Sequence, residues 1–102
     1  MSFYSLDSHV LQHPTIKKLN IAYAMYCVAD GNTPLRVKHL FKDMLILAKK
    51  GGFDVVNMTE EMQHKHVLDD LLFKVGDGHF KHYFYNWNLT HVQPEDIGII
   101  ML

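Results

Sequence analysis

Eight histidines and one cysteine are the side chains of this sequence that could bind a metal ion or act as a nucleophile. His64 and His66 lie two residues apart in a segment expected to be helical, so they point to different faces of that helix. His79 and His82 lie in an expected strand and face opposite ways. Since no cysteine or carboxylate completes a zinc-binding spacing, the sequence predicts no metal site.

Cys27 is the only cysteine, which leaves no partner for a disulfide within the chain. It lies in the apolar run from Ile21 to Val28. This setting favours a small buried side chain over a reactive thiol.

A loop from Ala29 to Thr33 leads into the start of a long expected helix, where free backbone N–H groups can bind a pyrophosphate. The loop contains one glycine, and Asp30 would repel phosphate. The sequence therefore does not favour a phosphate-bearing ligand at this loop.

These residues are carried by an alternation of strands and helices, which predicts an α/β (α+β) sandwich with a mixed, mostly antiparallel sheet flanked by helices. The helices are expected from Pro34 to Lys50 and from Thr59 to Leu72, with a short helical turn at Thr15 to Leu19. The strands are expected at Phe3 to Leu6, Asn20 to Val28, Phe53 to Met58, Phe80 to Trp87 and Ile97 to Leu102.

The longest helix has signals at both ends. Thr33 is a natural N-cap, and Pro34 suits the first helical position. Gly51 and Gly52 can supply the left-handed conformation that ends a helix. Gly76-Asp77-Gly78 is a turn signal between the second helix and the aromatic strand.

The chain has 102 residues, which predicts a single domain over residues 1–102. Its formal net charge is -1. This charge does not favour nucleic acid or an anionic membrane as a partner. No secretory signal or membrane-spanning run is apparent, so we expect a soluble, cytoplasmic domain. A domain this small is marginally stable alone, which favours a homo-oligomer or a partner chain.

Several stretches, in order along nearly the whole chain, resemble the C-terminal part of the N-myristoyltransferases. Leu71 to Trp87 (LLFKVGDGHFKHYFYNW) is similar to the family's LKFGIGDGNLQYYLYNW. The other matching stretches are Phe3 to Leu6 with His13-Pro14-Thr15 (family FYTLPS…HPT), Ala22, Tyr23 and Tyr26 (AYSFYN), Thr33 to Leu35 with Leu45 to Asn57 (TPL…LVLAKMKGFDVFN), and Gly98 to Leu102 (GLVLQ or GLVLL).

The sequence also departs from the family pattern. Leu72-Phe73-Lys74 stands where the family has KFG, Lys81-His82-Tyr83 stands for QYY, and Cys27 replaces a strand asparagine. These changes border the peptide site that the resemblance implies, so they bear on peptide preference.

The resemblance implies an acetyltransferase-like (GNAT-like) half domain that binds a peptide with an N-terminal glycine. Family enzymes have two such halves, and the first binds myristoyl-CoA. Here the acyl-CoA, a co-substrate and not a permanent cofactor, would be held by a partner chain, a second copy or a rebuilt pocket.

The family's general base is the terminal carboxylate, which here belongs to Leu102. An N-terminal amine has a pKa of about 7.7–8 and a terminal carboxyl of about 3.3–3.7, so the proton would move uphill by roughly 6 kcal/mol. Burial among Ile99, Ile100 and Met101 would raise the carboxyl pKa and reduce this difference. The alternative is a last strand that only completes the sheet.

The resemblance also implies the substrate-binding residues. Gly76, Asp77 and Gly78 would shape the pocket near the substrate N-terminus, although a tight hairpin turn explains them equally well. The remaining positions that match the family's peptide groove are Ser8, Leu19, Tyr23, Asn57, Phe80 and Met101. Each of five positions also has a structural alternative. This is a place in the core for Leu19, Tyr23 and Phe80, and a role in a cap or turn for Ser8 and Asn57.

Two functions from different classes follow. The first is an N-myristoyltransferase-like enzyme that transfers a myristoyl group to an N-terminal glycine. The second is a non-catalytic module that binds such peptides. A dimerising α/β domain with a vestigial pocket is a third alternative.

Overall fold

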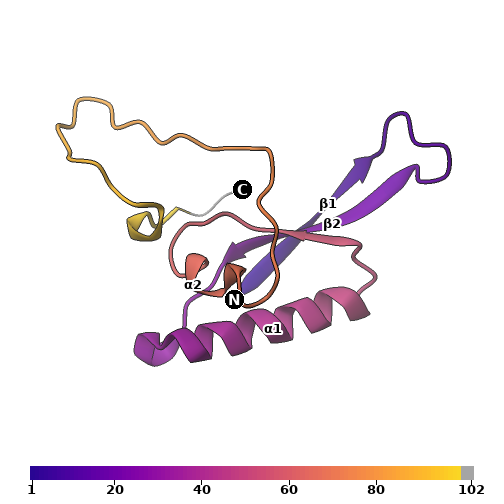
Figure 1. The fold of residues 1–102 in the computed structure, drawn as a ribbon, viewed down its shortest axis with the longest axis horizontal. Coiled ribbons are helices and arrows are strands. Elements are labelled where there is room, and N and C mark those ends of the chain that lie inside the picture. Colours follow the sequence, from indigo (N-terminus) through magenta and orange to yellow (C-terminus); the bar gives the residue numbers. More distant parts are fainter. Residues whose placement is uncertain (100–102) are drawn as a thin grey trace.

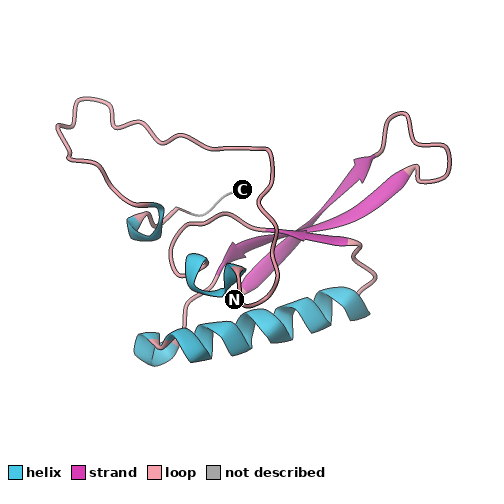
Figure 2. Ribbon diagram, in the orientation of Figure 1, coloured by secondary structure: helices cyan, strands magenta, loops and turns pink. Residues whose placement is uncertain are grey.

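A computed structural model describes residues 1–99 as a small α+β domain (Figures 1 and 2). The expected alternation is confirmed for the first five elements. In chain order these are β1 (Ser2–His9), β2 (Lys18–Tyr26), α1 (Pro34–Lys50), β3 (Val55–Asn57) and α2 (Lys65–Leu68), with 3-10 turns at Asp30–Asn32 and Pro94–Asp96.

The three strands form one mixed sheet in the order β1-β2-β3. β1 and β2 are an antiparallel hairpin, whereas β3 is parallel to β2 and is reached through α1. Asn20 fixes the start of the parallel pair, because its backbone N–H donates to Asp54 Oδ2 at 3.0 Å and its carbonyl accepts from the Asp54 N–H at 2.9 Å.

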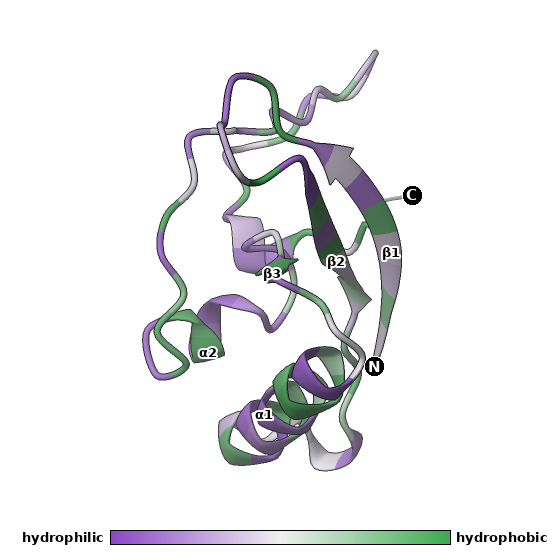
Figure 3. Ribbon diagram, turned by 90° about the vertical axis from the view of Figure 1, so that its right-hand side faces the viewer, coloured by the Kyte–Doolittle hydropathy of each residue, from purple (hydrophilic) through white to green (hydrophobic). Residues whose placement is uncertain are grey.

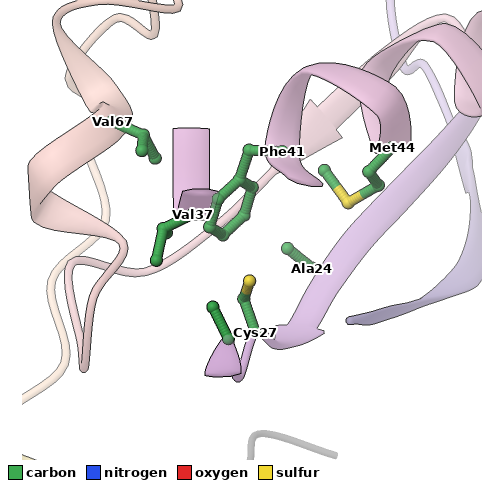
Figure 4. Close-up of a cluster of buried hydrophobic side chains, with 7 residues drawn as sticks. Ala24, Cys27, Val37, Phe41, Met44 and Val67 are labelled. Carbon is green, nitrogen blue, oxygen red and sulfur yellow. The ribbon is translucent and has the colours of Figure 1, made fainter. Parts of the chain in front are cut away.

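The core lies between α1 and one face of the sheet. Val37, Phe41, Met44 and Ala48 recur at helical spacing along α1, and all four are buried. Figure 4 shows Phe41 and Met44 facing Ala24 and Cys27 of the β2 segment, and Val67 of α2 closes the same cluster. The small side chains at Ala22 and Ala24 let α1 approach the sheet closely.

The expectation that Cys27 is a small buried side chain is confirmed. It is 2% exposed, and burial raises the pKa of its thiol. A neutral thiol packs as a small apolar group and is a poor nucleophile.

Helix α1 begins and ends at the expected residues, with Thr33 as the N-cap residue and Pro34 at the first helical position. Gly52 has a φ of 81° and its N–H donates to the Lys49 carbonyl, while Phe53 N–H donates to the Ala48 carbonyl. This pair of bonds is a Schellman motif with glycine in the left-handed position. Thr33 caps the other end through its backbone carbonyl, and its hydroxyl makes no cap bond.

The helices lie on one side of the sheet, which corrects the expectation of a sheet flanked on both faces. Helix α2 packs against α1 rather than against the opposite face (Figure 3). Helix α2 is also much shorter than the expected Thr59 to Leu72. Residues 15–17 form no helix, because β2 begins at Lys18.

The aromatic segment from Phe80 to Trp87 is a loop, so the strand expected there is wrong. Tyr83, Phe84 and Tyr85 are all exposed, on a long arc that leaves the body of the domain in Figure 1. Strand propensity reflects packing against neighbouring strands, and within residues 1–99 no strand pairs with this segment. Residues 97–99 form no strand, and the rest of the expected last strand lies outside the described residues.

The segment after α2 ends in a second Schellman motif. Leu72 N–H donates to the Asp69 carbonyl and Phe73 N–H to the Leu68 carbonyl. The left-handed position is filled by Leu72, with a φ of 60°, and its side chain is 86% exposed. A branched L-residue in this conformation is strained.

We predict that Leu72→Gly stabilises the domain by about 0.5–1 kcal/mol, because relief of left-handed strain exceeds the added entropy of the unfolded chain. Gly52→Ala should destabilise it by about 1 kcal/mol for the converse reason. Urea unfolding measures both, and Leu72→Ala controls for loss of the side chain. Equal stabilities of Leu72→Gly and Leu72→Ala would contradict this explanation.

Candidate functional site

Four of the predicted groove residues lie on one face of the sheet. Ser8 of β1 is directly opposite Leu19 of β2, and Tyr23 of β2 is directly opposite Asn57 of β3. Directly opposite residues share a face, and Leu19 and Tyr23 are four apart on one strand, so all four side chains share it. The sheet therefore brings together residues that are up to 49 positions apart in sequence.

This face points away from α1. Ala22 and Ala24 alternate with Tyr23 along β2, and Ala24 packs in the core beneath α1. The odd-numbered residues of β2 must therefore lie on the opposite side. We call this side the open face; besides the four residues above, register places Tyr4, Leu6, Ile21, Met25 and Val55 on it.

The open face carries no acidic or basic side chain. Leu19, Tyr23 and Ser8 are half-buried, and Asn57 is exposed. A surface of aromatic and aliphatic groups with a few hydroxyls and one amide suits an uncharged chain segment that supplies its own backbone hydrogen-bonding groups.

Tyr4 also lies on the open face, and no sequence motif pointed to it. Its ring stacks on that of Tyr23, with ring centroids 5.6 Å apart and an interplanar angle of 16°. The stacking fixes the orientation of Tyr23 on the open face. The hairpin register would have identified Tyr4, but the register depends on where β1 begins and ends, which the pattern gave as only Phe3 to Leu6.

The other predicted site residues are not assembled with the open face. Gly76, Asp77, Gly78 and Phe80 are exposed on the loop from 74 to 93, and Phe80 is 67% exposed. This excludes the core role considered for Phe80. Met101 and Leu102 lie outside the described residues.

A buried carboxylate attaches this loop to the body of the domain. Glu61 is 5% exposed, accepts a hydrogen bond from the Thr59 hydroxyl at 3.2 Å, and lies 3.3 Å from Nε2 of His82. His82 is thus the point at which the loop that carries Gly76-Asp77-Gly78 is tied back to the domain. From the sequence, His82 was considered as a metal ligand and as a departure from the family motif, and this contact with Glu61 was not foreseen.

His64 is fully buried beside Glu61 and packs edge-on against Phe41 of α1, with ring centroids 5.2 Å apart. Its Nδ1–H donates to the Thr59 carbonyl at 2.8 Å, which leaves Nε2 as the unprotonated nitrogen of a neutral ring. Among the described residues, Nε2 has no hydrogen-bond partner. Burial lowers the pKa of His64, against opposing effects of the Thr59 carbonyl and Glu61.

Two hollows of the domain were compared with the open face. One of about 360 Å³ opens beside Asn57 and is lined by Leu45, Val55, Val56, Asn57, Leu71, Leu72, Phe73 and Lys74. A larger one of about 470 Å³ lies between Cys27, Met62 and the segment from Glu95 to Gly98, and includes none of the predicted substrate residues among residues 1–99. We therefore regard the smaller hollow as the one connected to the candidate site.

Within residues 1–99, no group of three or more histidine, cysteine, aspartate or glutamate side chains is arranged to hold a metal ion. The helices of that same part of the chain are too short or too polar to cross a bilayer.

Comparison with known families decides the identity. Residues 1–100 match the family described as "Myristoyl-CoA:protein N-myristoyltransferase, C-terminal domain". The chain belongs to this family. The resemblance inferred from the sequence motifs is therefore confirmed over almost the whole chain.

Individual N-myristoyltransferases agree with this assignment. The chain is 44% identical over 101 residues to glycylpeptide N-tetradecanoyltransferase 2 of Danio rerio. This aligned region covers 99% of this chain and 20% of that protein. It is 42% identical to a probable glycylpeptide N-tetradecanoyltransferase of Caenorhabditis elegans, over 99% of this chain and 22% of that one. It is 41% identical to the glycylpeptide N-tetradecanoyltransferase of Plasmodium falciparum, over 100% of this chain and 24% of that protein. The chain thus spans about a fifth to a quarter of these relatives.

Burial of the His64 imidazole predicts that the stability of the fold depends on pH. Because the pKa of His64 is lower in the folded than in the unfolded chain, its neutral form stabilises the fold above about pH 6.5, and this stability is lost as pH falls through the folded pKa. Protonation would create an unpaired buried N–H at Nε2. We expect stability to fall by at most about 1.4 kcal/mol per pH unit from this residue.

Urea unfolding of wild type and His64→Phe between pH 7.5 and 5 tests this prediction. The phenylalanine variant should lose part of the acid dependence, whereas a control at the exposed His39, His39→Gln, should keep it. An unchanged pH dependence in His64→Phe would contradict the assignment.

Proposed function

We propose that this chain is the peptide-binding part of a glycylpeptide N-tetradecanoyltransferase-type acyltransferase, which transfers a myristoyl group from myristoyl-CoA to an N-terminal glycine. The family match over residues 1–100 supports the proposal most strongly. The four groove positions that share the open face support it independently, because they are far apart in sequence and meet only in the folded sheet.

In this proposal the peptide lies extended along the open face. The distance from Ser8 and Leu19 to Tyr23 and Asn57 corresponds to four residues of a strand, or about 13 Å, which matches four or five residues of an extended peptide. Ser8 and Asn57 supply hydrogen bonds, while Leu19 and the Tyr4–Tyr23 stack bury apolar groups.

The chemistry is assigned to the chain end and to the glycine-rich loop. The carboxylate of Leu102 acts as general base toward the amine of the substrate glycine, and Asp77, between Gly76 and Gly78, attracts its ammonium form. Phe80 and Met101 are assigned to substrate binding because they match the family's peptide-groove positions. The domain is, on this proposal, an acetyltransferase-like half, and its setting is cytoplasmic.

The acyl-CoA is proposed to bind elsewhere. The relatives are four to five times longer than this chain, and family resemblance places the acyl-CoA in their other half. On this proposal, a partner chain, a second copy of this chain or a rebuilt pocket holds the acyl-CoA. The loop at Asp30–Asn32 retains an acidic residue, which disfavours a pyrophosphate there.

A non-catalytic module that binds N-terminal glycine peptides is the second candidate. One observation favours it: the open face is assembled, whereas Gly76, Asp77 and Gly78 lie on an exposed loop and are not joined to that face. Such a protein would bind peptide without transferring an acyl group.

The test uses a peptide with a free N-terminal glycine and the same peptide acetylated at that amine. Acetylation removes the positive charge and the nucleophile, so calorimetry should show weaker binding of the capped peptide. Incubation of the free peptide with the protein and myristoyl-CoA should give a 14-carbon adduct in mass spectrometry. Binding without an adduct supports the module, and equal binding of both peptides contradicts the site itself.

The base is tested by adding one glycine after Leu102. The extension moves the carboxylate by about 3.3–3.6 Å and leaves an amide, which cannot accept the proton, in its place. Transfer should fall by about 10²–10⁴-fold, with thermal unfolding unchanged. Full transfer by the extended protein would rule out the terminal carboxylate.

A further inference from the structure

The hollow beside Asn57 continues the open face around the edge of the sheet. Val55 and Asn57 belong to the open face, and both also line the hollow. Val56, which points to the α1 side, lines it as well, so the hollow passes over the free edge of β3. A peptide on the open face can therefore place one side chain in it.

The walls of this hollow are mainly apolar. Leu45 of α1 and Val55 and Val56 of β3 form one side, and Leu71, Leu72 and Phe73 form the other. Its volume of about 360 Å³ accommodates a side chain with an aliphatic stem. Polar groups come from two residues only, Asn57 and Lys74.

Lys74 is the one charged residue among those that line the hollow. Asp70, close by in sequence, is paired with Lys38 at 2.9 Å, and Asp69 does not line the hollow. Within residues 1–99, no acidic group lies within ion-pair distance of Lys74. The Schellman motif after α2 fixes the backbone that leads to Lys74, through the bond from Phe73 N–H to the Leu68 carbonyl at 2.9 Å.

We propose that this hollow accepts an acidic side chain of the bound peptide and that Lys74 determines this preference. The inference rests on the proposed function, because it takes the open face as the peptide site. The apolar walls contact the stem of a glutamate, and the ammonium group of Lys74 and the amide of Asn57 bind its carboxylate. A lysine at the same peptide position meets a like charge, which disfavours it.

The expected preference is small but measurable. Lys74 is exposed, and ion pairs at exposed sites change an equilibrium by about two- to fivefold. Added salt should reduce the preference, since exposed charges are screened. A glutamine of the same length retains the hydrogen bonds but lacks the charge, so it provides the matched comparison.

The experiment uses peptides with a free N-terminal glycine in which one following position at a time is glutamate or glutamine. Wild-type protein should bind the glutamate peptide about two- to fivefold more tightly at one position or two neighbouring positions, measured by fluorescence anisotropy. Lys74→Glu should reverse that preference. Arg36→Glu makes the same charge change at the other end of α1 and should leave it unchanged.

The possible outcomes distinguish a failure of this inference from a failure of the proposed function. Peptides that bind with equal affinity at every position, or a preference that survives in Lys74→Glu, would overturn this inference and leave the proposed function intact. A protein that binds none of the free-glycine peptides would overturn the proposed function, and this inference with it.

Discussion

The register of β2 is the constraint on which the rest of the molecule depends. Its even-numbered residues, Ala22 and Ala24, are the floor on which α1 packs, and its odd-numbered residues, Leu19 and Tyr23, form the open face. A shift of one residue would exchange the two sets, which would place Tyr23 under α1 and the alanines on the open face. Burial of Phe41 and Met44 against small side chains therefore also determines the composition of the candidate site.

Two interactions hold this register in place. On one side, the hairpin aligns β1 so that Tyr4 stacks on Tyr23. On the other side, the reciprocal bonds between Asn20 and Asp54 align β3 at the point where the chain leaves α1. Three-stranded packing of this kind, rather than any single motif, brings Asn57 next to Tyr23 and so makes a continuous surface for an extended ligand.

The sequence predicted those parts of the fold that depend on local signals. The apolar spacing from Val37 to Ala48, with Pro34 and Gly52 at the ends, was sufficient to define α1, because each signal acts within one helical turn. The strand at Phe80 to Trp87 was wrong, since β-structure requires a neighbour that a local pattern does not specify. The same limit applies to the site: Tyr4 becomes recognisable only when the hairpin register is known.

Family resemblance implied six peptide-groove positions, Ser8, Leu19, Tyr23, Asn57, Phe80 and Met101, and the sheet brings the first four of them onto one face. The sequence did not identify the buried Glu61 and His64 or the half-buried His82 beside Glu61, because these histidines were considered only as metal ligands and, at His82, as a departure from the family motif. Their role is structural: His82 contacts Glu61 and ties the glycine-rich loop to the domain, and His64 fills the space between α2 and Phe41. No residue spacing predicts such an arrangement, which depends on how a long loop folds back.

The distribution of charge divides recognition between two surfaces. The open face has no acidic or basic side chain, so it can select a ligand only by shape, apolar contact and backbone hydrogen bonds, and these depend little on salt. Lys74 adds a charge at the edge of β3, where a ligand side chain leaves the face. The sequence places this lysine where the family pattern has glycine, just after the turn that follows α2. On the proposed function, a change at this position can therefore alter which peptides are preferred without disturbing the register that builds the face.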